Sequence, residues 1–177
     1  DKLLGDVLDC EFHFDRFVPE IQGKEWKYGN PVGGGTLYDL GVHLIDQAVD
    51  LFGKPEAVFC RLFNQREGSA VDDSFDLKLI YPNLNVTLKA GVFVKEQGPR
   101  IAIHGKKGSF VKYGIDPQEA ILRNGGMPLG DDWGKQPEED WGILNTQING
   151  LNFRGKIETL PGNYHAYFND IYHAIVD

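Results

Sequence analysis

A series of short segments with alternating apolar and polar residues restricts the fold more than any other feature of this sequence. Alternation with a period of two is typical of strands that bury one face. We predict strands at residues 6–14, 57–64, 74–81, 85–94, 100–105 and 109–114. The short connections Pro-Asn-Leu and Gly-Lys-Lys-Gly favour antiparallel neighbours. The sequence therefore predicts a mostly antiparallel sheet.

Helical spacing of apolar residues marks two longer segments. Residues 36–52 begin with Thr-Leu-Tyr-Asp, which fits a capping box, and are followed by Gly53 as a stop signal. Residues 164–177 form a predicted closing helix, and shorter helices are predicted at 116–126 and 137–145. These elements predict one α+β domain over residues 1–177, a mostly antiparallel open sheet with helices packed on one face.

The helix predicted at 36–52 has a narrow polar stripe. At about 100° per residue, Asp39, His43, Asp46 and Asp50 fall within roughly 60°, and apolar residues occupy most of the remainder. We therefore expect the helix to be buried nearly all round and the stripe to face a cleft. A glycine on the apolar side, Gly41, would allow another element to approach closely.

Asp39 and His43 are the candidate catalytic pair. They lie one turn apart, so the carboxylate can fix the tautomer of the ring and favour the imidazolium form. A histidine oriented in this way can accept a hydroxyl proton while a hydride leaves the same carbon. Simpler interpretations remain open: Asp39 closes the capping box, His43 is structural, and Asp46 is a solvated surface charge. A metal site is disfavoured because no second histidine lies at usable spacing.

The run GGGTLYDLGVHLIDQAVDLFGKP (33–55) resembles the carboxy-terminal domain of the Gfo/Idh/MocA oxidoreductases, the relatives of glucose-fructose oxidoreductase and inositol dehydrogenase. FDRFVP (14–19) and IHGKKGSF (103–110) extend the resemblance. It implies a two-part enzyme, with an amino-terminal Rossmann domain for NAD or NADP and a carboxy-terminal domain for substrate contacts. This chain has no Gly-x-Gly-x-x-Gly after a strand and no counterpart of the family's catalytic lysine. We expect it to be the second part, inactive alone.

The resemblance also implies a substrate and roles for several residues. Asp39 and His43 would stand beside a secondary alcohol of a sugar, an inositol or a related polyol, with His43 as acid and base. Candidate substrate contacts are Asp46, Arg16, Trp26 and His165. The alternatives are a non-catalytic binding or oligomerisation module, and a glycosidase that uses bound NAD transiently.

Composition restricts partners and location. The net charge is −8 and the basic residues are scattered, which disfavours nucleic acid, and no apolar run reaches the ~18 residues of a membrane span. Cys10 and Cys60 predict reduced, buried thiols, and no secretory signal is visible, so a cytoplasmic location is expected. The open sheet, with Phe75, Leu77 and Leu79, is the candidate surface for a homo-oligomer.

Overall fold

The strands form one open sheet in the computed structural model, which describes residues 3–21, 32–130 and 132–177. Within these residues the order is β2-β3-β4-β1-β5-β6-β7-β8, and all neighbours are antiparallel except β1 and β4. The bounds are Val7–His13 (β1), Ala57–Phe63 (β2), Ser74–Ile80 (β3), Asn85–Ala90 (β4), Ile101–Gly105 (β5), Gly108–Lys112 (β6), Gly142–Ile148 (β7) and Leu151–Ile157 (β8).

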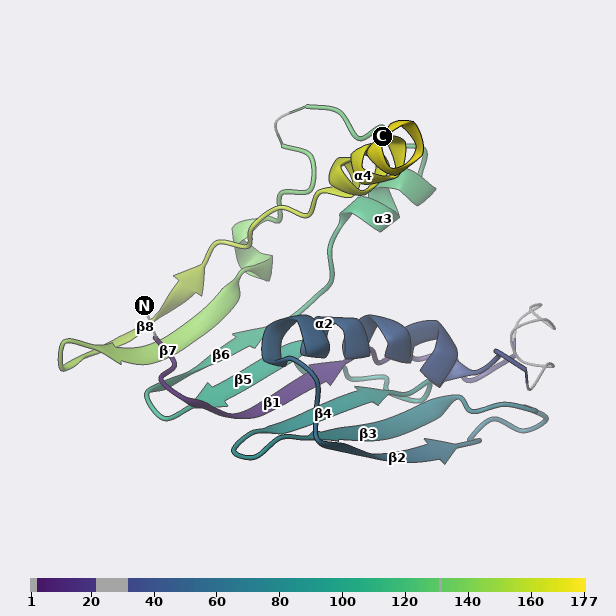
Figure 1. Ribbon diagram of the computed structural model, residues 1–177, viewed down its shortest axis with the longest axis horizontal. Helices are drawn as coiled ribbons and strands as arrows, with labels where there is room; N and C mark the ends of the chain where they lie inside the picture. Colours follow the sequence, from purple (N-terminus) through teal and green to yellow (C-terminus); the bar gives the residue numbers. More distant parts are fainter. Residues whose placement is uncertain (1–2, 22–31, 131) are drawn as a thin grey trace.

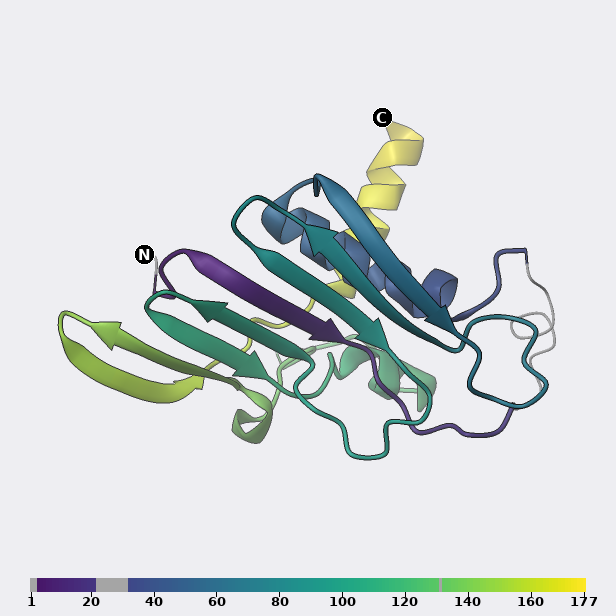
Figure 2. The same ribbon diagram turned by 90° about the horizontal axis from the view of Figure 1, so that it is seen from below.

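The helices lie on one side of this sheet. A single turn of π-helix, η1 (Leu37–Gly41), leads directly into α2 (Val42–Phe52), and α3 (Gln118–Arg123), a 3-10 turn η2 (Glu138–Asp140) and α4 (Tyr164–Val176) follow. Figure 1 shows α2 lying along the sheet, and Figure 2 shows the opposite face uncovered. The predicted α+β architecture is confirmed. None of the described helices is both long and apolar enough to cross a bilayer.

The core lies between α2 and the middle strands. It consists of alternate residues of β1, β3 and β4 and of one face of η1 and α2: Cys10, Phe12, Phe75, Leu77, Leu79, Val86, Leu88, Ala90, Leu40, Leu44 and Ala48. Gly41 permits close contact here, because an added Cβ would lie 3.3 Å from the ring of Phe75. The expectation that Gly41 allows a close approach is confirmed.

Two expectations about burial were wrong. The helix is not buried all round, since Val42, Val49 and Leu51 are exposed and only its sheet-facing residues are buried. One-sided packing is enough because a sheet covers a single helix face. The three apolar residues assigned to an oligomer surface, Phe75, Leu77 and Leu79, lie in the core under α2. Successive residues of a strand point to opposite faces, so the uncovered face presents the alternate set, which is mostly polar but includes the exposed Ile80 and Phe59.

Two further corrections concern Cys60 and residues 137–145. Cys60 is exposed because β2 is the edge strand, whereas Cys10, on the central strand β1, is buried as expected. Burial raises the pKa of the Cys10 thiol to about 12, so it stays protonated. Residues 137–145 were predicted as a helix, but they form η2 and the first part of β7.

Candidate active site

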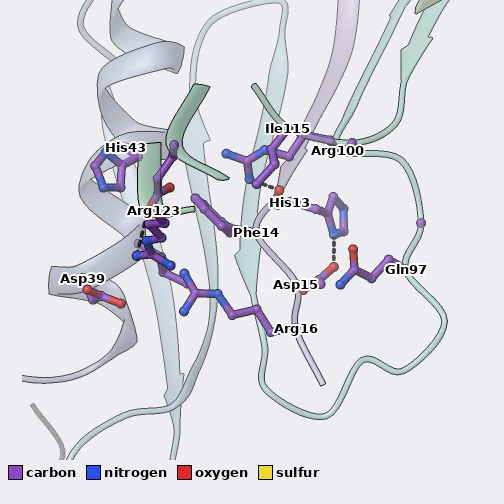
Figure 3. A pocket seen from close by; sticks show the side chains of 14 residues that line it. His13, Phe14, Asp15, Arg16, Asp39, His43, Gln97, Arg100, Ile115 and Arg123 are labelled. Carbon is purple, nitrogen blue, oxygen red and sulfur yellow. Dashed lines mark hydrogen bonds and ion pairs between the residues drawn. The ribbon is translucent and has the colours of Figure 1, made fainter. Parts of the chain in front are cut away.

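A cleft of about 640 Å³ lies at the end of β1, between the start of α2 and α3. Figure 3 shows the side chains that face it. They come from five separate stretches of chain: His13 to Arg16, Asp39 with Leu40 and His43, Gln97 with Gly98 and Arg100, Gly114 with Ile115, and Glu119 with Arg123. The structure therefore brings Arg16, Asp39 and His43, all predicted from the sequence, to one cavity.

The helix that contributes Asp39 and His43 begins differently from the sequence prediction. The Thr36 side chain makes no capping hydrogen bond. Asp72, from the connection between β2 and β3, takes that role: its Oδ2 accepts from the backbone N–H of Leu37 at 2.8 Å. The capping box was wrong because a carboxylate distant in sequence occupies the position that a local side chain would otherwise fill.

Asp39 and His43 lie on either side of the junction between the π-turn and α2. The backbone N–H of Asp39 donates to the Gly35 carbonyl at 3.1 Å, which connects the start of the turn to the glycine run at residues 33–35. A π-turn has more residues per turn than an α-helix, and such turns are frequent at functional sites. The His43 ring remains exposed and its centroid lies 6.5 Å from that of Phe14. Both side chains thus face the cleft from one wall.

Two arginines flank Phe14 on the opposite wall. The guanidinium carbons of Arg100 and Arg16 lie 4.0 and 5.1 Å from the centroid of the Phe14 ring, and Arg100 donates to the backbone carbonyl of His13. Burial lowers the pKa of Arg100 to about 10, so it remains charged at neutral pH. Guanidinium groups donate several hydrogen bonds in a fixed geometry, which suits hydroxyl oxygens.

A histidine that the sequence analysis assigned only to a strand also lines the cleft. His13 contacts Asp15 through Nδ1 at 2.9 Å and Glu11 through Nε2 at 3.1 Å. The pKa of His13 is raised, mainly by the hydrogen bond with Asp15. Carboxylates on both ring nitrogens favour the doubly protonated imidazolium. The Asp15 and Glu11 carboxylates therefore favour the charged form of the His13 ring at the cleft.

The remaining lining residues include a second ion pair that sequence analysis missed. Arg123 Nη2 lies 2.6 Å from Glu119 Oε1, one turn apart on the short helix α3. The helical spacing of Glu119 and Arg123 was a usable signal for the pair. Nothing local in the sequence indicated that α3 would contribute to the same cleft as α2.

Two of the other predicted contacts, Asp46 and His165, do not reach the cleft lining. Asp46 is exposed on α2, one turn beyond His43. His165 lies at the start of α4, where its Nε2 is 2.6 Å from the Pro128 carbonyl oxygen. Trp26 lies outside the described residues.

Comparison with known proteins connects this geometry to one family. A sequence profile described as "Oxidoreductase family, C-terminal alpha/beta domain" matches residues 1–177. The scyllo-inositol 2-dehydrogenase (NADP(+)) of Bacillus subtilis is 42% identical over 97% of this chain and 48% of its own length. An uncharacterized oxidoreductase of Escherichia coli is 38% identical over 99% of this chain and 50% of its own length.

Solved structures show the same fold. An oxidoreductase of Bacillus subtilis, yvaA, superposes with a TM-score of 0.91 at 40% identity, covering 98% of this chain and 49% of that one. The chain thus spans about half the length of the relatives it matches.

Proposed function

Because the chain belongs to the oxidoreductase family as its C-terminal alpha/beta domain, we propose that it forms the substrate half of an NAD(P)-dependent dehydrogenase. The substrate is a secondary alcohol of a sugar, an inositol or a related polyol. The observation that supports this most directly is the presence of Asp39 and His43 on one wall of the cleft. The name of the inositol dehydrogenase relative favours a cyclic polyol and NADP.

The coenzyme would be bound mainly by protein outside this chain. The residues present fit only its reacting end, since His43 is exposed at the cleft and no glycine-rich phosphate-binding fingerprint follows any strand of the sequence. When bound, the nicotinamide would supply hydride acceptance.

The residues of this chain would accept and return the hydroxyl proton and orient the alcohol. His43 accepts the hydroxyl proton as the carbonyl forms and returns it in the reverse direction. Asp39 stabilises the imidazolium that results. Arg16 and Arg100 donate to the other hydroxyls, and the apolar face of the substrate ring lies against Phe14. Asp46 and His165 are not included, because they lie outside the lining.

The test uses the full-length protein and the absorbance of the nicotinamide during turnover of a panel of polyols. His43→Ala is expected to lower kcat by about 10²- to 10⁴-fold, the range for loss of a general acid or base. Asp46→Asn is the matched control on the same helix, and it is expected to retain turnover. Unchanged kcat in His43→Ala would remove His43 from the chemistry.

The same assay separates the alternatives. A binding or oligomerisation module would show no turnover with any polyol. A glycosidase that uses NAD transiently would retain the coenzyme tightly and release a sugar without net change in absorbance. Neither has a specific observation in its favour among the described residues.

We also propose that the uncovered face of the sheet forms the contact between copies of the chain. Its polar residues include Glu11, Asp76, Lys78 and Lys89, so the contact would combine charges of both signs. Light scattering on Lys78→Glu with Lys89→Glu tests this face, and an unchanged oligomeric mass would exclude it.

A further inference from the structure

We propose that Asp72 is a positioning residue, which fixes the start of the helical segment formed by η1 and α2 and thereby places Asp39 and His43 at the cleft. The proposal depends on the proposed function for what these two side chains do, but not for where they are held. It concerns the connection between β2 and β3, residues 64–73, which contributes no residue to the cleft lining.

Asp72 binds two successive backbone amides at the helix start. Its side-chain Oδ2 accepts from the N–H of Leu37 at 2.8 Å, and its backbone carbonyl accepts from the N–H of Thr36 at 2.9 Å. The first amides of a helix have no partner within the helix, and a negative charge there is favourable for the helix dipole. Asp72 therefore fixes both the position and the direction of the turn that contains Asp39.

The third glycine of the glycine run gives this contact its close geometry. Gly35 has φ of +96°, and a Cβ added to it would lie 2.2 Å from Oδ1 of Asp72. No other residue would leave the carboxylate in its place. The Gly35 carbonyl in turn accepts from the N–H of Asp39. Gly35 therefore connects the position of Asp72 to the backbone of Asp39.

The same connection also holds the other wall of the cleft. Arg66 Nε donates to the carbonyl of Val18 at 2.8 Å, two residues after Arg16. Arg66 is itself set by Asp73, a fully buried carboxylate that accepts from the N–H groups of Gln65 and Arg66, each at 2.8 Å. The two adjacent aspartates thus have different roles. Asp73 accepts hydrogen bonds within the connection and holds its conformation, whereas Asp72 joins the connection to the start of the helix.

The fold explains why a connection without cleft residues can have this role. Residues 14–21 follow β1 and provide Arg16, and residues 32–37 lead into the turn that contains Asp39. Residues 64–73 contact both of these stretches, at Val18 and at Leu37. A displacement of about 1 Å in a reacting group costs up to about 100-fold in rate.

The experiment compares Asp72→Ala, Asp72→Asn and Thr36→Val in the full-length protein. Asp72→Ala is expected to lower kcat by about 10- to 100-fold with KM for the coenzyme unchanged, because the helix start moves and the coenzyme site does not. Asp72→Asn keeps an amide oxygen that can accept from Leu37, so it is expected to retain most of the activity. Thr36→Val is the matched control: it keeps the buried volume and removes a hydroxyl that makes no cap.

A second readout does not depend on catalysis. Hydrogen exchange of the Leu37 and Thr36 amides in this chain is expected to accelerate in Asp72→Ala and to stay slow in Thr36→Val. Thermal unfolding confirms that each variant is folded. If Asp72→Ala does not fold, Gly35→Ala replaces it, since the added Cβ displaces the same carboxylate.

Each pattern of results decides the proposal. Unchanged exchange and unchanged kcat in the Asp72 variant overturn it, and so do equal losses in Asp72→Ala and Thr36→Val. If His43→Ala leaves turnover intact while Asp72→Ala accelerates exchange at Leu37, the placement by Asp72 stands and the proposed function fails. If His43→Ala abolishes turnover and Asp72→Ala changes neither readout, the function stands and the positioning role fails.

Discussion

The helices α2 and α4 have similar apolar spacing and opposite burial. In α2, Leu44 and Ala48 are 0% exposed. In α4 every residue is exposed, including Phe168 at 63% and Ile175 at 77%. Two helices with comparable patterns therefore have quite different roles in the stability of this chain.

The difference arises from what lies opposite each helix. α2 lies over β1, β3 and β4, whose alternate residues are apolar, whereas α4 lies away from the sheet (Figure 1). α4 is fixed by polar contacts at its start: Asn163 Oδ1 accepts from the N–H of Ala166, and Gln118 Oε1 accepts from the N–H of Tyr164. An amphipathic pattern predicts which face of a helix is apolar, but it does not identify the surface that covers that face.

The largest expected effect is a core substitution in α2. Leu44→Ala removes a fully buried side chain from the core cluster that also contains Phe75, and it is expected to lower the free energy of unfolding by about 2–5 kcal/mol. Urea unfolding of this chain followed by circular dichroism measures the change. A loss below about 1 kcal/mol would show that α2 contributes no more packing than a surface helix.

The sequence predicted the sheet and α2 well because their patterns are local. Alternation in 57–64 and 74–81 corresponds closely to β2 and β3. The pair β7 and β8 was missed, although Asn149 and Gly150, with φ of 51° and 82°, form the Asn-Gly turn that signals a hairpin. The charged run before Trp141 suggested a helix instead, and tertiary pairing with β6 overrode that propensity.

The candidate site could be predicted only where its residues share one element. Asp39 and His43 lie on one helix, so their common face follows from the periodicity. Arg100 and Asp72 come from loops distant in sequence, and their positions depend on the order of strands in the sheet. Long-range placement of this kind has no local signature.

A smaller effect is expected at His13, the last residue of β1, whose contribution to the free energy of unfolding depends on pH. The folded-state pKa of His13 is raised above its usual value, chiefly by the hydrogen bond with Asp15. Its stabilisation is therefore complete below about pH 6.5 and is lost as the pH rises through the raised value. His13→Gln is expected to be less stable than the parent at about pH 5.5, by less than about 1 kcal/mol for this partly exposed pair, and equal to it at about pH 9. Urea midpoints at the two pH values measure this, and a difference that grows with pH would contradict the assignment.

The smallest expected effect lies in α4. Phe168 contacts Tyr167, with ring centroids 5.5 Å apart, and is otherwise exposed, so Phe168→Ala is expected to change the unfolding free energy of this chain by no more than about 0.5 kcal/mol. Exchange of the α4 amides should also be faster than that of α2, because a helix of 13 residues without a packed face opens locally. A loss comparable to that of Leu44→Ala would remove the contrast between the helices. The same substitution in the full-length protein then sharpens it: a larger loss there than in this chain would mean that residues outside the chain cover the apolar face of α4.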